Sequence, residues 1–508
     1  MRLSTMLRAF LLTLPVLGFV PTPFVKSLSA QESRPSTSRA PTVSAVLGRP
    51  TDRSVAVNLT SNRRVRAQVE YGKSPTALDK KSAAVDLEPG SPAEVELLDL
   101  VSNAATHYRV RWTSAGNGES TASAVSEFMT QRAKGSTFTF GVQGDSHPER
   151  AGKMFNAGLY RETLGQVAAG NPDFYIALGD DFSVDRLIER KQVNEASVAR
   201  IYEDQRNYLA VAGHTVPIFL VNGNHEQAGR WMLDGTPNNI AAIAGRTRTK
   251  FFSLPAPDHF YTGDPEVVEH VGLLRDYYAW TWGDALFVVL DAYWHSKVPV
   301  DHEVTGRRQR GEDAPRGEDA PRGGGRQRDL WEVSIGDAQY AWFKKTLEAS
   351  NAPYKFVFCH HVLGTGRGGV EQADLYEWGG KDRRGRDQFA EKRPTWELPI
   401  HQLMVKHGVS IFFQAHDHIY CMQEKDGIVY QSTPNPADNT YTAFNAAAYK
   451  TGVKHPNSGH LRVVVSPKET KVDYVRAVLQ KDENAERKNA TIAHSYTVSP
   501  KVKAETPK

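Results

Sequence analysis

The chain has 508 residues, too many for one ordinary domain, and its 40% hydrophobic and 24% charged residues are ordinary globular values that exclude wholesale disorder and a polytopic membrane protein. Three of its four excess positive charges lie in the first thirty residues, so the charge does not indicate a nucleic-acid partner. The two cysteines, Cys359 and Cys421, exclude a disulfide-built scaffold and a Cys-rich zinc site, but leave open whether they pair.

Residues 1–30 have the pattern of an export signal. Arg2 and Arg8 precede the apolar run from Ala9 to Val20, and small residues end at Ala30. The run is shorter than the roughly 20 residues that span a bilayer, with an uncleaved anchor as the alternative. We expect a periplasmic or secreted protein with no stable membrane span after signal cleavage, whose Ser/Pro/Arg-rich linker (31–41) leads to the first domain.

Residues 42–132 alternate apolar and polar residues and show no helical stretch, as in Ser54–Leu59, Val65–Tyr71 and His107–Trp112. Short alternating runs between Gly, Pro, Ser and Asn clusters predict a small β-sandwich. No catalytic motif is evident in it, and its single histidine, His107, is interpreted as a surface or satisfied residue.

From residue 137 to 480, apolar strands alternate with helical stretches, which predicts a layered α/β domain with part of its sheet antiparallel. The expected strands are Thr137–Val142, Phe174–Leu178, Ile218–Val221, Ala285–Leu290, Lys355–Cys359, Val409–Gln414, Gly427–Thr433, Leu461–Val465 and Lys471–Val478. The expected helices are Tyr160–Ala169, Glu195–Ala212 and Gly336–Ser350. Residues 481–508 are expected to form a C-terminal tail.

An insertion at 306–328 contains a duplicated hexapeptide, Arg-Gly-Glu-Asp-Ala-Pro, starting at Arg310 and again at Arg316. A sequence so rich in Gly, Pro and charge cannot bury enough apolar surface to order itself. We expect a disordered surface loop, with a role in binding left open.

Five predicted strands end in groups of metal-ligand residue types. They are Gly144-Asp145-Ser146-His147, Gly179-Asp180-Asp181, Gly223-Asn224-His225-Glu226, Cys359-His360-His361 and Ala415-His416-Asp417-His418. Each group alone is common. Because open α/β sheets gather the loops at their strands' carboxyl ends, the five together predict one site.

This series of motifs resembles the calcineurin-like metallophosphoesterases, whose pattern is Asp-x-His, Gly-Asp, Gly-Asn-His-Asp/Glu, His and Gly-His-x-His. The resemblance covers Phe138 to Leu479 and implies a layered αββα metallophosphoesterase sandwich behind a small all-β domain. That first domain, with its Tyr108–Arg111 strand, is similar to the fibronectin type III-like domain of purple-acid-phosphatase-like members.

The resemblance implies two divalent or trivalent metal ions, of Fe, Mn or Zn. One ion takes Asp145, His147, Asp180 and His418, and the other takes Asp180, Asn224, His360 and His416. Two ions roughly 3.5 to 4 Å apart, bridged by Asp180, lower the pKa of a shared water and neutralise phosphoryl charge. The implied reaction is hydrolysis of a phosphate ester by attack of a metal-bound hydroxide.

His225, with Asn224, is expected to face the substrate, where His225 stabilises phosphoryl charge or protonates the leaving oxygen. Glu226 either orients His225 or caps a helix. His360 is favoured over His361 as the ligand because it takes the family's ligand position directly after the strand. Three further acidic residues are interpreted as solvated loop residues: Asp181, Asp417 and Glu371.

Three positions depart from the family pattern. Ala415 replaces a usual Gly, which keeps the loop if its backbone is not left-handed. Val362 replaces a frequent Pro. Ser183 replaces the tyrosine that binds metal in purple acid phosphatases, so we expect no tyrosinate ligand here.

We expect an exported, acid-phosphatase-like enzyme, foremost a phosphomonoesterase acting on a small phosphorylated substrate. A phosphodiesterase or nucleotide-cleaving member of the same family would use the same centre and stays open. A non-catalytic cell-surface binding module is the third possibility, although decay would normally remove a ligand and every motif is filled. The near-neutral charge speaks against a nuclease.

Overall fold

The computed structural model describes residues 41–114, 118, 120–226, 229–297, 300, 329–362 and 366–501. The expected export signal (1–30), the linker up to residue 40 and the expected disordered insertion (306–328) lie outside these residues. Within the described ranges, no helix is long and apolar enough to cross a membrane.

Two antiparallel sheets form the N-terminal part of the chain, as its alternating sequence predicts. One has the strand order β1-β2-β6, and the other has β4-β3-β7-β8 with β5 beside β3 and β9 beside β7. The strands are β1 (Val43–Gly48), β2 (Val55–Ser61), β3 (Val65–Gly72), β4 (Lys80–Lys81), β5 (Val85–Leu87), β6 (Ala93–Leu97), β7 (Ala105–Ser114), β8 (Ser120–Ala122) and β9 (Ser126–Met129). Alternate residues, such as Val55, Val57 and Leu59, enter a shared apolar core. This part is the expected all-β sandwich.

Two larger sheets form the rest of the fold, one ordered β12-β11-β10-β23-β24-β25 and the other β13-β16-β17-β18-β19-β21-β20-β22. The first contains β10 (Phe138–Gln143), β11 (Phe174–Ala177), β12 (Ile218–Leu220), β23 (Gly459–Val465), β24 (Thr470–Arg476) and β25 (Ile492–Val498). The second contains β13 (Thr262–Gly263), β16 (Tyr278–Trp282), β17 (Ala285–Val289), β18 (Tyr354–Phe358), β19 (Ile411–Gln414), β20 (Tyr420–Lys425), β21 (Ile428–Ser432) and β22 (Val453–His455), while β14 (Val267–Val268) pairs only with β15 (Gly272–Leu273). Strands β10 to β12 are mutually parallel, as are β17, β18, β19 and β21, so their carboxyl ends lie at one edge of each sheet.

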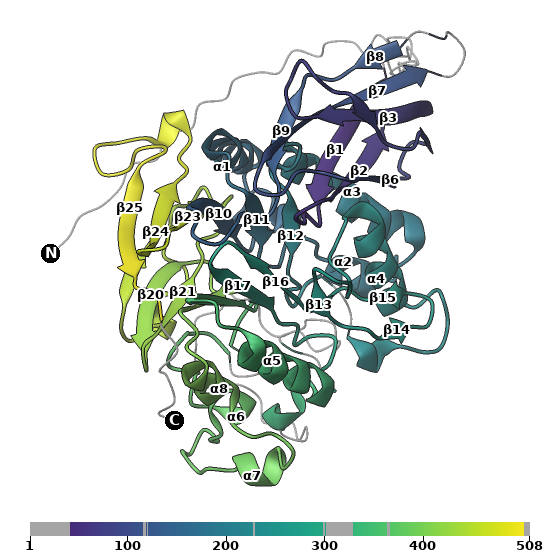
Figure 1. The fold of residues 1–508 in the computed structure, drawn as a ribbon. Coiled ribbons are helices and arrows are strands. Elements are labelled where there is room, and N and C mark those ends of the chain that lie inside the picture. Colours follow the sequence, from purple (N-terminus) through teal and green to yellow (C-terminus); the bar gives the residue numbers. More distant parts are fainter. Residues whose placement is uncertain are drawn as a thin grey trace, which may run out of the picture. The chain divides into compact units, whose positions relative to one another are not determined.

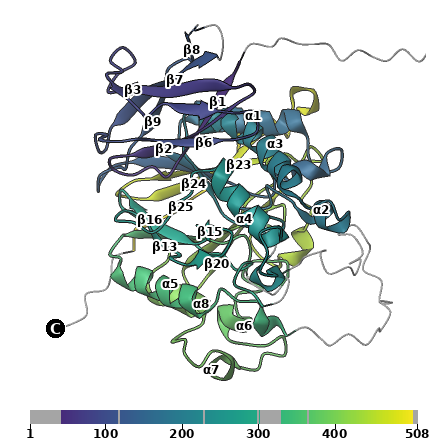
Figure 2. The same ribbon diagram turned by 90° about the vertical axis from the view of Figure 1, so that its right-hand side faces the viewer.

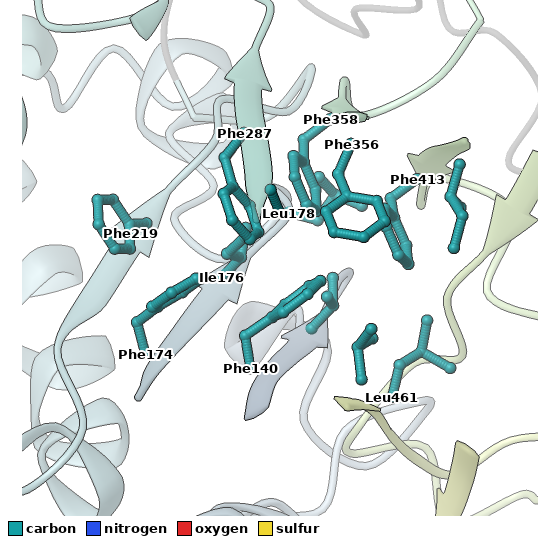
Figure 3. Close-up of a cluster of buried hydrophobic side chains, with 14 of the residues drawn as sticks. Phe140, Phe174, Ile176, Leu178, Phe219, Phe287, Phe356, Phe358, Phe413 and Leu461 are labelled. Carbon is teal, nitrogen blue, oxygen red and sulfur yellow. The ribbon is translucent and has the colours of Figure 1, made fainter. Parts of the chain in front are cut away.

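The two sheets face each other across an aromatic core (Figure 3). The ring of Phe287 lies 5.1 Å from those of both Phe140 and Phe174, and Phe140 lies 5.5 Å from Phe356. Along β11, Phe174 and Ile176 point into this core, whereas Tyr175 points to the opposite face. Side chains of a strand alternate between its two faces, and both faces of β11 are apolar, as expected for a strand that is covered on both sides.

Helices cover the outer face of each sheet, which gives the four-layer αββα arrangement. Leu164 of α1 packs in one cluster with Tyr175, and Phe343 of α5 and Leu403 of α8 pack in another with Val357. Figure 1 shows α1 beside β10 and β11 and α5 beside β17, and Figure 2 shows α5 and α8 again on the side of β13 and β16. The helices are α1 (Ala157–Gly170), α2 (Asp185–Glu189), α3 (Glu195–Gly213), α4 (Ile240–Phe251), α5 (Asp337–Ala349), α6 (Tyr376–Gly379), α7 (Phe389–Lys392) and α8 (Ile400–Lys406).

Every strand and helix expected between residues 137 and 478 is confirmed, with ends displaced by three residues at most. The expected tail from residue 481 is wrong for β25, which pairs with β24 at the edge of the six-stranded sheet. Its side chains are only partly buried, which weakens the apolar pattern that marks a strand. Cys359 and Cys421 are free, buried thiols.

The β-sandwich contacts the layered α/β part through a buried arginine. Arg206 of α3 is 1% exposed and donates from Nε to Asn58 Oδ1 at 3.2 Å and from Nη2 to the carbonyl of Asn58 at 2.6 Å. Its Nη1 donates to Thr60 Oγ1 at 2.8 Å. Asn58 also donates to the carbonyl of Lys250 in α4 at 3.0 Å. Polar groups of β2 are thus satisfied by the helices that cover β11 and β12.

Candidate metal centre

Each predicted metal ligand, and His225 with them, lies in the loop that follows a strand of the two facing sheets. Asp145 and His147 follow β10, Asp180 follows β11, Asn224 and His225 follow β12, His360 follows β18, and His416 and His418 follow β19. All eight side chains belong to buried residues. The carboxyl ends of strands from both sheets therefore bring together the five motifs that are dispersed over 274 positions of sequence, from 145 to 418.

The clustered side chains fall into two groups. Asp145, His147 and His418 each offer an atom within 4.8 Å of the others, and so do Asp180, His360 and His416. In the first group, the Nε2 atoms of His147 and His418 lie 3.2 Å apart, and His418 Nε2 lies 3.4 Å from Asp145 Oδ1. Nitrogen and carboxylate donors converging in this way suit a first-row transition ion in each group.

Asp180 lies between the groups. Its Oδ2 is 3.1 Å from His360 Nε2 in one group and 3.6 Å from His147 Nε2 in the other. Asn224 adjoins the second group, with Oδ1 3.0 Å from His416 Nδ1. Asp180 can therefore reach both groups, and Asn224 can add a neutral oxygen to one of them.

The hydrogen bonds around the ligand atoms fit metal binding. Both carboxylate oxygens of Asp145 are buried and have no hydrogen-bond partner among the described residues, an arrangement that is costly without a cation. His360 Nδ1 lies 2.8 Å from the carbonyl of Leu178, and His147 Nδ1 lies 2.8 Å from Glu149 Oε1. Such partners hold a histidine in the tautomer whose Nε2 is free to bind a metal.

The ligand loops are tightly turned. Asp145, His147, Asp180, His416 and His418 all have left-handed backbones, with φ between 48° and 68°. For residues other than glycine, this conformation costs about 1 to 3 kcal/mol and is often found at functional sites. Ala415 is not among the left-handed residues, so the condition for replacing the usual Gly is met.

Close approach explains two motif glycines. A Cβ on Gly223 would collide with Oδ1 of Asp180, and one on Gly144 would collide with the methyl group of Ala415. Glycine at these positions allows the loop after β12 to approach the loop after β11, and the loop after β10 to approach the loop after β19.

His225 lies beside the two groups and is held by a carboxylate that the sequence analysis did not identify. Its Nδ1 hydrogen-bonds Asp185 Oδ2, and its Nε2 lies 3.8 Å from Asp180 Oδ2 and 3.3 Å from Arg150 Nη2. Burial on its own lowers the pKa of His225, but the charges of Asp180 and Asp185 outweigh it and raise this pKa well above its ordinary value. Burial, helped by Arg150, lowers the pKa of His147 well below its ordinary value, which favours the neutral, ligating form.

Neither role expected of Glu226 is found. Its carboxylate accepts hydrogen bonds from the backbone N–H groups of Gly223, Asp180, Asp181 and Phe182, at 2.5 to 3.2 Å. Glu226 therefore orders the loop that carries Asp180. The sequence did not indicate this role, because three of the four partners lie 44 to 46 positions away.

Two of the acidic residues interpreted as solvated are buried, so that interpretation is wrong for them. Asp181 and Asp417 are each 1% exposed. Asp181 Oδ1 accepts from Gln143 Nε2 at 3.1 Å, and Asp417 accepts from Tyr449 Oη at 2.7 Å and from Arg367 Nη1 at 3.1 Å. A third, Glu371, is partly buried and accepts from Gln423.

His361 lies next to the second group rather than in it. Its Nδ1 lies 2.6 Å from the hydroxyl of Tyr293, and its ring stacks on that of His416 with centroids 4.4 Å apart. The geometry thus brings His360, the favoured of the two, to Asp180. Tyr293, in the loop after β17, is a neighbour of the site that no sequence motif indicated.

Residues 138–420, more than half of the chain, match the calcineurin-like phosphoesterase family. No curated protein matches the sequence.

Among solved structures, PhoD is 13% identical, with 90% of each chain covered and a TM-score of 0.57, so the two share a fold. GAP50 of Plasmodium is 13% identical over 72% of this chain and 89% of that one, with a TM-score of 0.35. A putative 5'-nucleotidase from Staphylococcus aureus is 11% identical over 73% of this chain and 56% of that one, with a TM-score of 0.33. With its αββα layers and its clustered Asp, Asn and His motifs, the chain belongs to the calcineurin-like phosphoesterase family.

Proposed function

We propose that this protein is an exported, dinuclear metal-dependent phosphomonoesterase. The observation that carries the proposal is the position of Asp180, within 3.6 Å of a histidine of each ligand group. Two bound cations would acidify a water between them and neutralise phosphoryl charge. The proposed ligands are Asp145, His147, Asp180, Asn224, His360, His416 and His418.

The chain's own residues supply the rest of the proposed reaction. The Asp185 carboxylate orients the His225 ring, whose Nε2 faces the site and can donate a proton to the leaving oxygen. Arg150 adjoins His225, and Arg367 donates from Nη1 to the carbonyl of His416 at 2.8 Å. Two guanidinium groups beside the site suit a monoester, which carries about −1.5 to −2 charges at neutral pH, better than a singly charged diester.

Kinetics with paired substrates test this proposal. Purified protein would be reconstituted with Mn, Fe or Zn salts, its metal content measured, and kcat/KM compared for p-nitrophenyl phosphate and its bis ester. We expect about two metal ions in these ligand groups and a preference for the monoester. A diester preference would favour the diesterase alternative, and metal-loaded protein inactive on both would favour a binding module.

The proposed organisation is a cleaved export signal (1–30), a fibronectin type III-like domain (42–132) and a phosphoesterase domain that begins at 137 and includes β25. Arg2, Arg8 and the apolar run after them support export. Cell fractionation and N-terminal sequencing test it. Mature protein outside the cytoplasm that begins at Gln31 is expected, and an intact N-terminus in the cytoplasm would contradict it.

A further inference from the structure

A third cluster of ligand-type side chains lies outside the candidate metal centre and shares no residue with it. Asp264 follows β13, Asp276 precedes β16, and His295 lies in the loop after β17. One atom of each side chain lies within 4.8 Å of the others. We call these three residues the Asp264 cluster.

Three of the four carboxylate oxygens of the Asp264 cluster have hydrogen-bond partners. Asp264 Oδ1 accepts from the backbone N–H of Glu266 at 2.9 Å, and Asp276 Oδ1 accepts from that of Tyr277 at 2.9 Å. Asp276 Oδ2 lies 2.9 Å from His295 Nε2. The remaining oxygen, Oδ2 of Asp264, is buried and has no hydrogen-bond partner among the described residues.

The charge of this cluster is not balanced by protein groups. Asp264 and Asp276 are 2% and 1% exposed, and neither forms an ion pair with a Lys or Arg in the described part of the chain. Even with His295 protonated, two buried carboxylates would share one positive charge. Such an arrangement is costly unless a cation, or a proton shared between the carboxyls, compensates it.

Two members of the cluster, Asp264 and His295, border a surface cleft. The cleft has a volume of about 620 Å³, and Asp264 and His295 line it together with the charged residues Arg230, Glu266, Lys297 and Asp337. An ion can enter through such a cleft, and water can complete its coordination. One imidazole with two carboxylates suits Zn²⁺ or Mn²⁺, whereas Ca²⁺ and Mg²⁺ prefer oxygen ligands alone.

We propose that Asp264, Asp276 and His295 bind a third divalent transition-metal ion, Zn²⁺ or Mn²⁺, separately from the candidate metal centre. The ion would link the loop that carries His295 to the residues beside β13 and β16, which lie at one edge of the eight-stranded sheet. The same loop carries Asp291, which accepts a hydrogen bond from Asn222, and Tyr293, whose hydroxyl contacts His361. The third ion therefore stabilises the loop of Asp291, Tyr293 and His295, which adjoins the candidate centre, and it takes no part in proton transfer.

Metal stoichiometry in two backgrounds tests the proposal without relying on activity. Full-length protein would be loaded with Mn²⁺ or Zn²⁺, freed of excess ion and analysed by plasma mass spectrometry. We expect Asp264→Asn and His295→Ala to lose one equivalent relative to the wild type. In the Asp180→Asn background, in which the candidate centre is broken, one equivalent should remain, and adding Asp264→Asn should remove it.

The control variant is His259→Ala, an exposed histidine close in sequence, which should lose no metal. Asp264→Asn is nearly isosteric, so it keeps the test valid if His295→Ala does not fold. Melting temperatures give a second measurement: added metal should raise that of Asp180→Asn by several degrees and leave that of Asp180→Asn/Asp264→Asn unchanged. Unchanged stoichiometry and melting response in a folded Asp264→Asn variant would mean that a shared proton compensates the carboxylates, and would overturn the proposal. A third equivalent lost from otherwise active enzyme would leave the proposed phosphatase function intact.

Discussion

The Nε2 atoms of His147 and His418 lie 3.2 Å apart, although 271 positions separate the two residues in sequence. Two ring nitrogens facing each other at this distance, with Asp145 Oδ1 3.4 Å from one of them, describe a pocket for a cation rather than a packed core. Since His147 follows β10 and His418 follows β19, each sheet contributes one of the two histidines.

Asp180→Asn should lose bound metal and activity together. Asp180 adjoins both ligand groups, so its charge offsets the repulsion between two nearby cations. Metal analysis and kcat/KM measure the two effects. Asp185→Asn, which alters a nearby carboxylate outside both groups, is the control and should keep its metal. An Asp180→Asn variant with full metal content would disprove the bridging role.

His225→Ala should keep both active-site ions but lose rate by about 10²- to 10⁴-fold, the usual contribution of a general acid or base. Asp185→Asn should lower the rate less, by about 10- to 100-fold, because Asp185 only orients His225. Metal analysis beside single-turnover kinetics separates the two roles. Loss of metal from His225→Ala would make this histidine a ligand.

The iron-loaded, oxidised enzyme should lack a tyrosinate charge-transfer band in the visible. Ser183 stands where the resemblance to purple acid phosphatases implies a tyrosine ligand. The hydroxyl of Tyr175 contacts Gln143 at 3.1 Å, and that of Tyr293 contacts His361. Both tyrosine hydroxyls therefore contact residues outside the two ligand groups. Visible absorption and resonance Raman spectra provide the measurement. A strong green-to-yellow band with phenolate modes would show that a tyrosine has joined the metal.

Arg206→Met should weaken the docking of the β-sandwich. It would remove the donors to Asn58 and Thr60, and each buried acceptor left without a donor costs about 1 to 3 kcal/mol. Denaturant unfolding measures the loss. Arg200→Met, an exposed arginine on the same helix, is the matched control and should change little. Equal stability of the two variants would refute the importance of this contact.

His460 should make stability fall in acid. Burial first, and then the charge of Arg462, lowers the pKa of His460 to about 3, whereas histidine in an unfolded chain titrates near 6.5. Between these values only the unfolded state binds the proton, so the free energy of unfolding decreases as pH falls below about 6.5.

The His460→Gln variant should therefore lose less melting temperature between pH 7 and pH 5 than the wild type. The free energy of unfolding of the wild type should fall more steeply than that of the variant, by at most about 1.4 kcal/mol per pH unit. His259→Gln, at an exposed position, is the control. Parallel pH dependence of His460→Gln and the wild type would exclude this histidine as the cause.

Local sequence was enough to predict the strands with long apolar runs after residue 137 and the ligand motifs that follow five of them, but not others such as β16 and β20. Apolar runs such as Phe174–Ala177 indicate strands that are buried on both faces. The residues that follow them, such as Gly179 and Asp180, form tight turns, and these turns can be recognised from neighbouring residues in the sequence. The edge strand β25 gave no such pattern, because its side chains are only partly buried.

Only the tertiary structure decided which distant side chains meet. The pairing of Asp185 with His225 and the use of Glu226 by the Asp180 loop depend on how loops from different strands approach one another. The Asp264 cluster was not apparent in the sequence for the same reason: its members have no shared motif, and the pairing of β13, β16 and β17 brings them together. Hydrophobic periodicity and turn residues indicate structure only within a few neighbouring positions. A site is built from contacts between residues that are far apart in sequence, and no local pattern marks such contacts.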